Sequence, residues 1–316
     1  MKHHFRVIDA HCDTLLKMYY NKDLTFDADK HLDVTYKGLS EVNTLMQCFA
    51  IYLSEEDPHT SFESVLQYVT NFYERIIKSN HNMHWVKSKQ DLMHALQHQK
   101  IGAMLTMEGT DVLHGDLNKA VLLYLLGIRC VSLTWNFGNW AADGVKEPRQ
   151  AGLTLKGKRF IQKCNELGII LDVSHLSERS FWELTETTSK PYIASHSNVF
   201  DICNHPRNLK REQLKCIIEQ KGMIGLNFVP YFISSHPDEA NISTLLKHID
   251  YICAMKGKEH IGFGSDFDGI AQWTLDLEDS GKYNNLVNNL CKYYSEEEVH
   301  QFLWKNWFDF FMKWLP

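Results

Sequence analysis

The chain has 316 residues, of which 44% are hydrophobic and 23% are charged, and its formal net charge is −6. This composition is typical of a globular protein and excludes a largely disordered chain. The negative net charge is unlike the basic surfaces that bind nucleic acid or anionic membranes, so we expect neither as a partner.

The sequence contains no candidate for a transmembrane or export segment. No apolar run approaches the roughly 20 residues that cross a bilayer. Residues 1–6 lead directly into an apolar run without the hydrophobic region of a signal peptide, so we expect a cytoplasmic protein. The eight cysteines form no CxxC pair, and in this compartment we expect buried free thiols rather than disulfides.

Short apolar, β-branched runs alternate with longer amphipathic segments along the chain. Near-continuous apolar runs are typical of parallel strands that are covered on both faces. Between them, Ser177 is expected to cap one helix, and a second helix over residues 211–220 is expected to end near Gly222. The predicted strands are residues 5–10, 45–53, 101–107, 128–134, 169–173, 192–195, 223–228 and 261–264.

This alternation predicts an α/β protein with one domain, residues 1–316, folded as a single (β/α)8 TIM barrel. The length suits such a barrel, and no linker, repeat or low-complexity stretch divides the chain. A doubly wound open sheet alternates in the same way, but the glycine-rich dinucleotide loop that usually follows its first strand is missing. In a barrel, the catalytic groups lie at the C-terminal ends of the strands.

Residues able to bind a metal ion follow five of the eight predicted strands. Each alone has a structural explanation, such as a hydrogen-bonded core histidine, a helix cap or a turn. Unrelated polar residues would be scattered over both ends of the strands, whereas these all follow the C-terminal ends. Asp172 is expected to support a neighbouring ligand rather than to bind a metal itself. In chain order the residues are His11 and Asp13, Glu108, His175, His196, and Asp266 with Asp268.

These imidazoles and carboxylates predict a site for two metal ions. Burying them together without a cation costs several kcal/mol for each ion. A donor set without thiolates suits Zn²⁺, with Mn²⁺, Fe²⁺ or Co²⁺ as alternatives. We expect His11 and Asp13 to bind one ion, and His175 and His196 to bind the second. Glu108 is able to bridge both ions through its two oxygens.

Six short motifs lie at or near these strand ends: His-x-Asp after the first strand, Glu-Gly after the third, and DVSH, SHSN, HPRNL and GSDFDG. Together they resemble the renal (membrane) dipeptidase family of the metal-dependent amidohydrolase superfamily, in particular its bacterial cytoplasmic members. The resemblance extends over residues 7–306. It implies a (β/α)8 barrel with two zinc ions that hydrolyses dipeptides, often with a D-residue at the C-terminal position. It also implies a homodimer.

The resemblance implies a role for each site residue. A hydroxide that bridges the metals would attack the amide, with Asp266 as the general base and then the general acid. Arg207, in HPRNL, would bind the terminal carboxylate of the substrate through two parallel hydrogen bonds, although an ordinary surface ion pair is the alternative. The implied zinc ligands are His11, Asp13 and Glu108 for one ion, and Glu108, His175 and His196 for the other.

One position departs from the family pattern and bears on the substrate range. The mammalian members carry a histidine that contacts the substrate or intermediate, and Trp135 stands at this place. Indole has a single N–H donor and cannot replace an imidazolium. Asn136 or Asn139 could donate to the developing oxyanion instead, or Trp135 could form a wall of the pocket.

Two other functions are compatible with a barrel of this kind. Another amidohydrolase, such as an N-acyl amino acid deacetylase, lactonase or conjugate hydrolase, would use the same metal site. A non-catalytic binding protein would be expected to lack some of the ligands, yet all are present. The aromatic tail, residues 302–316, is predicted to form a closing helix on the barrel, part of which could be a dimer contact.

Overall fold

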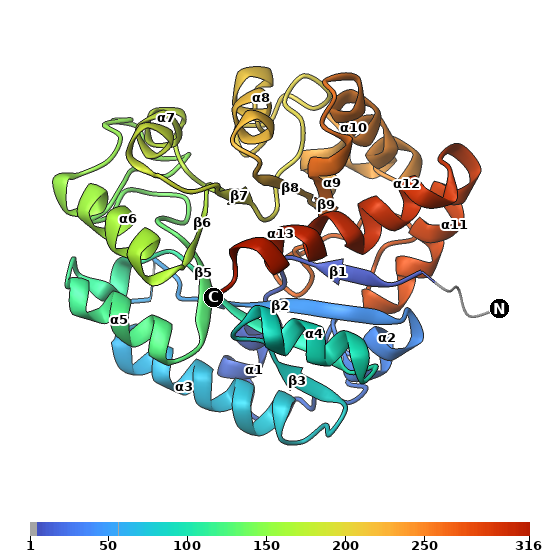
Figure 1. The fold of residues 1–316 in the computed structure, drawn as a ribbon, viewed down its shortest axis with the longest axis horizontal. Helices are drawn as coiled ribbons and strands as arrows, with labels where there is room; N and C mark the ends of the chain where they lie inside the picture. The colour runs from blue at the N-terminus through green and yellow to red at the C-terminus, as the bar shows by residue number, and fades with distance from the viewer. Residues whose placement is uncertain (1–4, 56) are drawn as a thin grey trace.

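The computed structural model describes residues 5–55 and 57–316, and these residues form a closed parallel β-barrel surrounded by helices (Figure 1). Eight strands make the ring in the order β1, β2, β4, β5, β6, β7, β8 and β9, and β9 pairs with β1 to close it. The predicted (β/α)8 barrel is therefore confirmed. The strands are β1 (Val7–Asp9), β2 (Thr44–Tyr52), β3 (Met83–Trp85), β4 (Ile101–Glu108), β5 (Ile128–Ser132), β6 (Ile170–Asp172), β7 (Ile193–Ala194), β8 (Met223–Leu226) and β9 (Ile261–Phe263).

The strand β3 was not predicted from the sequence. It pairs with the first three residues of β4, on the side where β5 pairs with the rest of that strand. Two of its three residues are only half-buried. A short strand with partial burial has no continuous apolar run, so it gives no signal of the kind that reveals the barrel strands, such as the fully buried β4.

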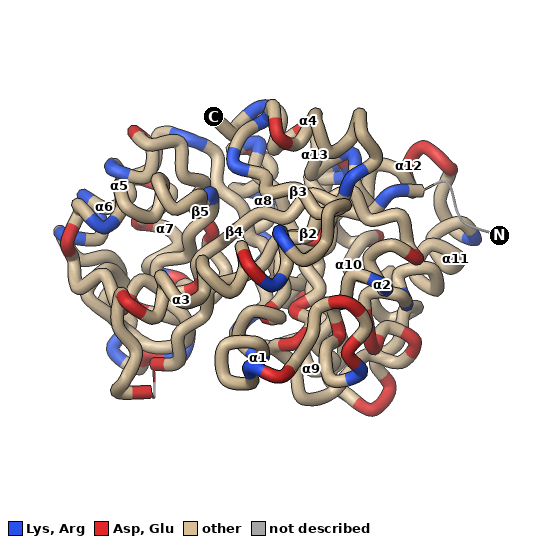
Figure 2. Tube along the Cα trace, turned by 90° about the horizontal axis from the view of Figure 1, so that it is seen from below, with Lys and Arg blue, Asp and Glu red and all other residues tan. Residues whose placement is uncertain are grey.

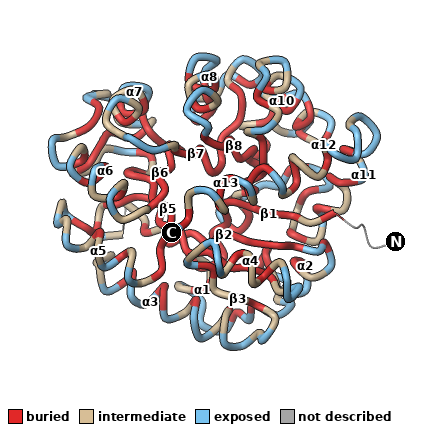
Figure 3. Tube along the Cα trace, viewed as in Figure 1, coloured by how far each residue is buried: buried red, intermediate tan, exposed pale blue. Residues whose placement is uncertain are grey.

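Apart from α13, the helices surround the barrel and expose their outer faces, whereas the barrel strands are almost entirely buried (Figure 3). Ser177 caps α7 as predicted, because its side chain accepts a hydrogen bond from the Ser180 N–H. The end of α8 differs slightly from the prediction, since Lys221 and not Gly222 adopts the left-handed conformation. The helices are α1 (Thr14–Tyr20), α2 (Tyr36–Glu41), α3 (Phe62–Phe72), α4 (Lys89–Gln97), α5 (Leu117–Leu125), α6 (Leu155–Leu167), α7 (Glu178–Thr187), α8 (Arg211–Glu219), α9 (Pro230–Ile233), α10 (Ile242–Ala254), α11 (Tyr283–Tyr293), α12 (Glu296–His300) and α13 (Asn306–Trp314).

The C-terminal helix α13 closes the end of the barrel at which the strands begin. Trp307, Phe310 and Phe311 pack against the inward-facing residues of the strands in one buried cluster. The Trp307 indole N–H donates to the carbonyl oxygen of Phe263 at 3.2 Å. Figure 2 shows α13 on the opposite side of the molecule from α1 and α9. The tail therefore packs on the barrel as predicted, and the homodimer stays a prediction.

Two further features bear on the expectations from composition. No helix in residues 5–55 and 57–316 combines the length and the apolar character needed to span a bilayer. All eight cysteines are free, as expected, but only five are buried, since Cys216 and Cys253 are half-buried and Cys291 is exposed. Cys12, which lies between two site residues, is buried, and this burial raises the pKa of its thiol well above the usual value. Packing is therefore the role that fits Cys12.

Candidate metal centre and substrate pocket

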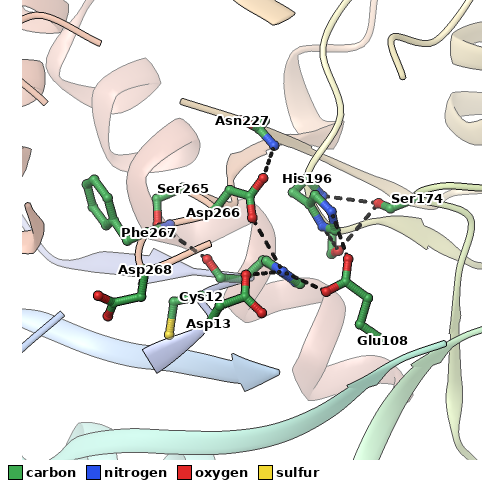
Figure 4. Close-up of polar contacts among 12 residues, drawn as sticks. Cys12, Asp13, Glu108, Ser174, His196, Asn227, Ser265, Asp266, Phe267 and Asp268 are labelled. Atoms are coloured by element: carbon green, nitrogen blue, oxygen red, sulfur yellow. Dashed lines mark hydrogen bonds and ion pairs between the residues drawn. The ribbon is translucent and has the colours of Figure 1, made fainter. Parts of the chain in front are cut away.

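The C-terminal ends of five barrel strands bring the predicted site residues together (Figure 4). Glu108 is the last residue of β4, and the others follow β1, β6, β7 and β9. Asp266 is half-buried, and the remaining members of the group are buried. The group consists of His11, Asp13, Glu108, His175, His196 and Asp266.

Glu108 lies between two sets of donors. Its Oε2 is 3.6 Å from the Nε2 of His11, which is 3.4 Å from the Oδ2 of Asp13. Its Oε1 is 2.8 Å from the Nε2 of His175 and 3.4 Å from the Nε2 of His196. One carboxylate therefore faces a different set of ligands with each of its oxygens.

A hydrogen bond to the far nitrogen fixes the tautomer of His175. Its Nδ1 lies 3.1 Å from the Oδ1 of Asn136, which can only accept a hydrogen bond. The proton is therefore on Nδ1, and the lone pair of Nε2 faces Glu108 and the Nε2 of His196 at 3.0 Å. Two imidazole lone pairs directed at each other favour a cation between them and the carboxylate.

His196 is held in the same way through Ser195 and Asp172. The Ser195 hydroxyl donates to the Oδ2 of Asp172 and lies 2.7 Å from the Nδ1 of His196. Because the hydrogen of that hydroxyl is directed at Asp172, the Ser195 oxygen accepts a hydrogen bond from the Nδ1–H of His196. Asp172 thus supports a ligand without touching the centre, as its position in the sequence suggested.

Unusual backbone conformations orient two of the site residues. His175 and Asp266 have φ values of +69° and +67°, in the left-handed region that residues other than glycine seldom occupy. Gly269 permits the close approach of the loop after β9, because a Cβ there would lie 2.2 Å from the Oδ2 of Asp13. Such local constraints cluster at functional sites, where the surrounding structure stabilises them.

The pKa shifts in the centre show that its buried carboxylates lack a compensating positive charge. Burial raises the pKa of Asp13 and of Glu108 to about 7. Burial by itself lowers the pKa of His11, but the negative charges of Glu108 and Asp13 outweigh it and raise the value to about 10. The Nε2 of His11 and the Oδ1 of Asp13 are buried without a hydrogen-bond partner in the described part of the chain.

The structure therefore fits bound metal ions. Oxygen and nitrogen atoms from His11, Glu108 and His196 lie within 4.8 Å of one another, as do those from His11, Asp13 and Asp266. Divalent cations would neutralise the buried carboxylates and occupy the unpartnered lone pairs. Imidazole and carboxylate donors without thiolates suit Zn²⁺ among such cations.

Asp266 is oriented by residues that the sequence analysis did not identify. Its Oδ2 accepts a hydrogen bond of 2.9 Å from the side-chain N–H of Asn227 (Figure 4). The Asn198 side chain in turn bonds the backbone of Asn227. Its Oδ1 faces the Nε2 of His11 at 3.7 Å. Asn227 directly follows β8, so a polar residue at that strand end was the signal available in the sequence.

Asp268 was grouped with the site residues by position, but its side chain binds elsewhere. It accepts hydrogen bonds from the Thr14 hydroxyl and from the backbone N–H groups of Asp33 and Val34, and it forms an ion pair of 2.8 Å with Lys17. Figure 4 shows it directed away from Asp13 and Asp266. Its role is to tie the loop after β9 to the first helix and its neighbouring loop.

A cavity of about 290 Å³ opens beside the metal centre. Arg207 lines it and is buried, and its guanidinium donates to the carbonyl oxygen of His196 at 3.1 Å and to the Ser197 hydroxyl at 3.4 Å. Its Nε has no hydrogen-bond partner among the described residues. The cavity is also lined by Leu16, Tyr52, Trp135, Asn136, Lys146, His205, Val229, Tyr231, Phe232, Gly269 and Ile270.

Of the alternatives raised by the departure at position 135, the structure favours the pocket wall. Trp135 lines the cavity between Tyr52 and His175, with ring centroids 5.1 and 5.9 Å away. The Asn139 side chain donates to Asp111 and to a backbone carbonyl, so it stabilises the loop. The Asn136 oxygen accepts a hydrogen bond from His175, which leaves its side-chain N–H groups out of this contact, so donation from Asn136 to an oxyanion stays a prediction.

Comparison with known proteins agrees with this geometry. The model of the membrane dipeptidase family (peptidase family M19) matches residues 1–313. An uncharacterized protein of Klebsiella pneumoniae is 31% identical over 70% of this chain and 84% of its own length. An uncharacterized dipeptidase of Schizosaccharomyces pombe is 29% identical over 92% of this chain and 74% of its own.

The solved structures show the same fold. A metallopeptidase from Rhodobacter sphaeroides, crystallised with a phosphinate mimic of the dipeptide L-Ala-D-Ala, superposes with a TM-score of 0.91 over 99% of both chains at 23% identity. The metal-binding residue types, their place at the strand ends and the family match over nearly the whole chain agree with one another. The chain belongs to the membrane dipeptidase family, peptidase family M19.

Proposed function

We propose that this metallopeptidase-family protein is a dipeptidase that works with two zinc ions. One ion would be held by His11, Asp13 and Glu108, and the other by Glu108, His175 and His196. The observation that carries the proposal is the position of Glu108, whose two oxygens face the two sets of donors at 2.8–3.6 Å. When bound, such a pair of ions activates water at neutral pH and polarises the carbonyl of the substrate.

Asp266 is the residue proposed to move the proton. It lines the cavity beside the metal centre, and its Oδ2 is held by Asn227. Its Oδ1 faces the same His11 nitrogen that faces Glu108. A carboxylate placed there can take a proton from the attacking water and deliver it to the leaving amine.

Arg207 is proposed to bind the terminal carboxylate of the dipeptide. It is a buried cation that lines the cavity and lies over the Phe232 ring, and the hydrogen-bond acceptors of its guanidinium within the described chain are a carbonyl oxygen and a hydroxyl. An incoming carboxylate would form the direct ion pair that this buried guanidinium does not make with the described residues. Binding of the substrate's end also fixes which amide lies at the metal centre and disfavours longer peptides.

Arg207→Lys is expected to lower kcat/KM for dipeptides by about 10- to 100-fold, mainly through KM, because an ammonium cannot form two parallel hydrogen bonds. Steady-state kinetics on a dipeptide and on its C-terminal amide measure the effect. The variant should lose the preference for the free carboxylate. Arg211→Lys, an exposed matched change on α8, should keep it. An unchanged preference in Arg207→Lys would contradict the assignment.

The proposed function is tested by incubating the zinc-loaded enzyme with L-Xaa-L-Xaa and L-Xaa-D-Xaa dipeptides and with N-acetyl amino acids. Release of free amino acids from one or both dipeptide series, at a kcat/KM above that for every N-acetyl amino acid, is expected. The two dipeptide series also reveal whether a D-residue is accepted. Greater activity on N-acyl amino acids than on every dipeptide would favour a deacetylase instead.

A further inference from the structure

Lys146 lines the same cavity from a loop that is fixed to the metal centre. Its backbone N–H donates to the carbonyl oxygen of Asn136 at 2.7 Å. The preceding N–H, of Val145, donates to the carbonyl oxygen of His175 at 2.7 Å. Because Asn136 also binds the His175 ring, the position of Lys146 is set by the same residues that orient a metal ligand.

The acidic neighbours of Lys146 are occupied by other groups. Asp143 and Glu147 both pair with Arg149, and Glu147 also accepts a hydrogen bond from the N–H of Gly138. Within residues 5–55 and 57–316, no carboxylate forms an ion pair with Lys146. Its side chain is exposed to solvent. The mouth of the cavity therefore carries an ammonium group that has no partner of opposite charge in the described protein.

Lys146 lies on the side of the cavity that also holds Arg207. His205 lines the cavity too, and its Nδ1 accepts a hydrogen bond from the N–H of Arg207 at 3.2 Å. Burial, together with the positive charges of Arg207 and Lys146, lowers the pKa of His205 to about 4, so both cations act at this ring. The two cations thus differ in depth, with Arg207 buried and Lys146 exposed at the rim.

We infer that Lys146 binds a second carboxylate, on the side chain of the C-terminal residue of the substrate, so that the enzyme prefers dipeptides ending in aspartate or glutamate. The inference rests on the proposed dipeptidase function, in which Arg207 binds the main-chain carboxylate of that same residue. A side chain that extends from this residue toward the rim meets Lys146. The cavity is also lined by Asp13 and Asp266, whose carboxylates would repel an acidic group placed beside them.

The test compares Ala-Glu with Ala-Gln, which differ in charge but hardly in shape. For the unmodified enzyme, the ratio of kcat/KM values should favour Ala-Glu by about 1.4- to fivefold, the range for an exposed, partly screened ion pair. The ratio should fall toward one in Lys146→Met and as sodium chloride is added. Lys146→Glu should reverse the charge preference, so that kcat/KM is higher for Ala-Lys than for Ala-Gln.

Two comparisons separate this inference from the alternatives. Lys215→Met removes a cation that pairs with Glu219 on α8, and it should leave the Ala-Glu to Ala-Gln ratio unchanged. The ratio of kcat/KM for Glu-Ala to that for Gln-Ala should not respond to Lys146→Met, because the acidic side chain is then on the N-terminal residue of the dipeptide. Equal responses of both ratios, or no response of the first, would overturn the inference. Failure of the unmodified enzyme to cleave any dipeptide would instead reject the proposed function.

Discussion

Removal of divalent metal with a chelator is expected to abolish hydrolysis, and addition of Zn²⁺ to the metal-free protein is expected to restore it. The buried group of carboxylates and imidazoles has unpartnered atoms on His11 and Asp13, and burial raises the pKa of Glu108 to about 7. Without a cation, the negative charges of the buried carboxylates are not neutralised, and no metal ion is present to activate water. Kinetics before and after metal exchange measure the loss and the recovery.

The same experiment has a stability readout. A metal that binds the folded chain more strongly than the unfolded chain raises the unfolding midpoint, so Zn²⁺ should raise the melting temperature of the metal-free protein by several degrees. His196→Ala removes a proposed ligand and should reduce this increase. Full activity in the chelated protein, verified to be free of metal, would contradict the account.

Asp266→Asn is expected to lower kcat by about 10²- to 10⁴-fold while the metal content stays nearly unchanged. The amide keeps the shape of the carboxylate and an oxygen for the hydrogen bond from Asn227, but it cannot take up the proton of the attacking water. Single-turnover rates together with elemental analysis of the variant measure the two effects separately.

Asp276→Asn provides the matched control for this change. Asp276 lies in the same loop after β9, is exposed, and has a φ of +68° that asparagine also tolerates. This variant should retain the kcat of the unmodified enzyme. Wild-type turnover in Asp266→Asn would show that another group moves the proton.

The barrel was predictable because its strands are buried on both faces. Strands such as β2 and β4 appear in the sequence as nearly unbroken apolar runs, and the position of each strand end then locates the polar residues that follow. His11, Glu108 and His196 were found in this way. The end of the barrel that α13 closes was not predictable, since a helical apolar pattern does not specify the surface on which it packs.

The residues that orient the proposed ligands were harder to predict than the proposed ligands themselves. Ser195 acts by linking Asp172 to His196, and Asn227 acts on a carboxylate 39 positions further along the chain. These roles depend on distances between separate loops, for which the sequence has no periodic pattern. The same is true of Lys146, whose position is set by backbone hydrogen bonds within its loop and not by a strand end.

The most direct test of the account is the number and place of the metal ions. Elemental analysis of the zinc-loaded protein, with anomalous diffraction from its crystals, should give two zinc ions per chain, one on either side of Glu108. One should lie with His11 and Asp13, and the other with His175 and His196. Absence of zinc from these side chains in the loaded protein would contradict the central claim.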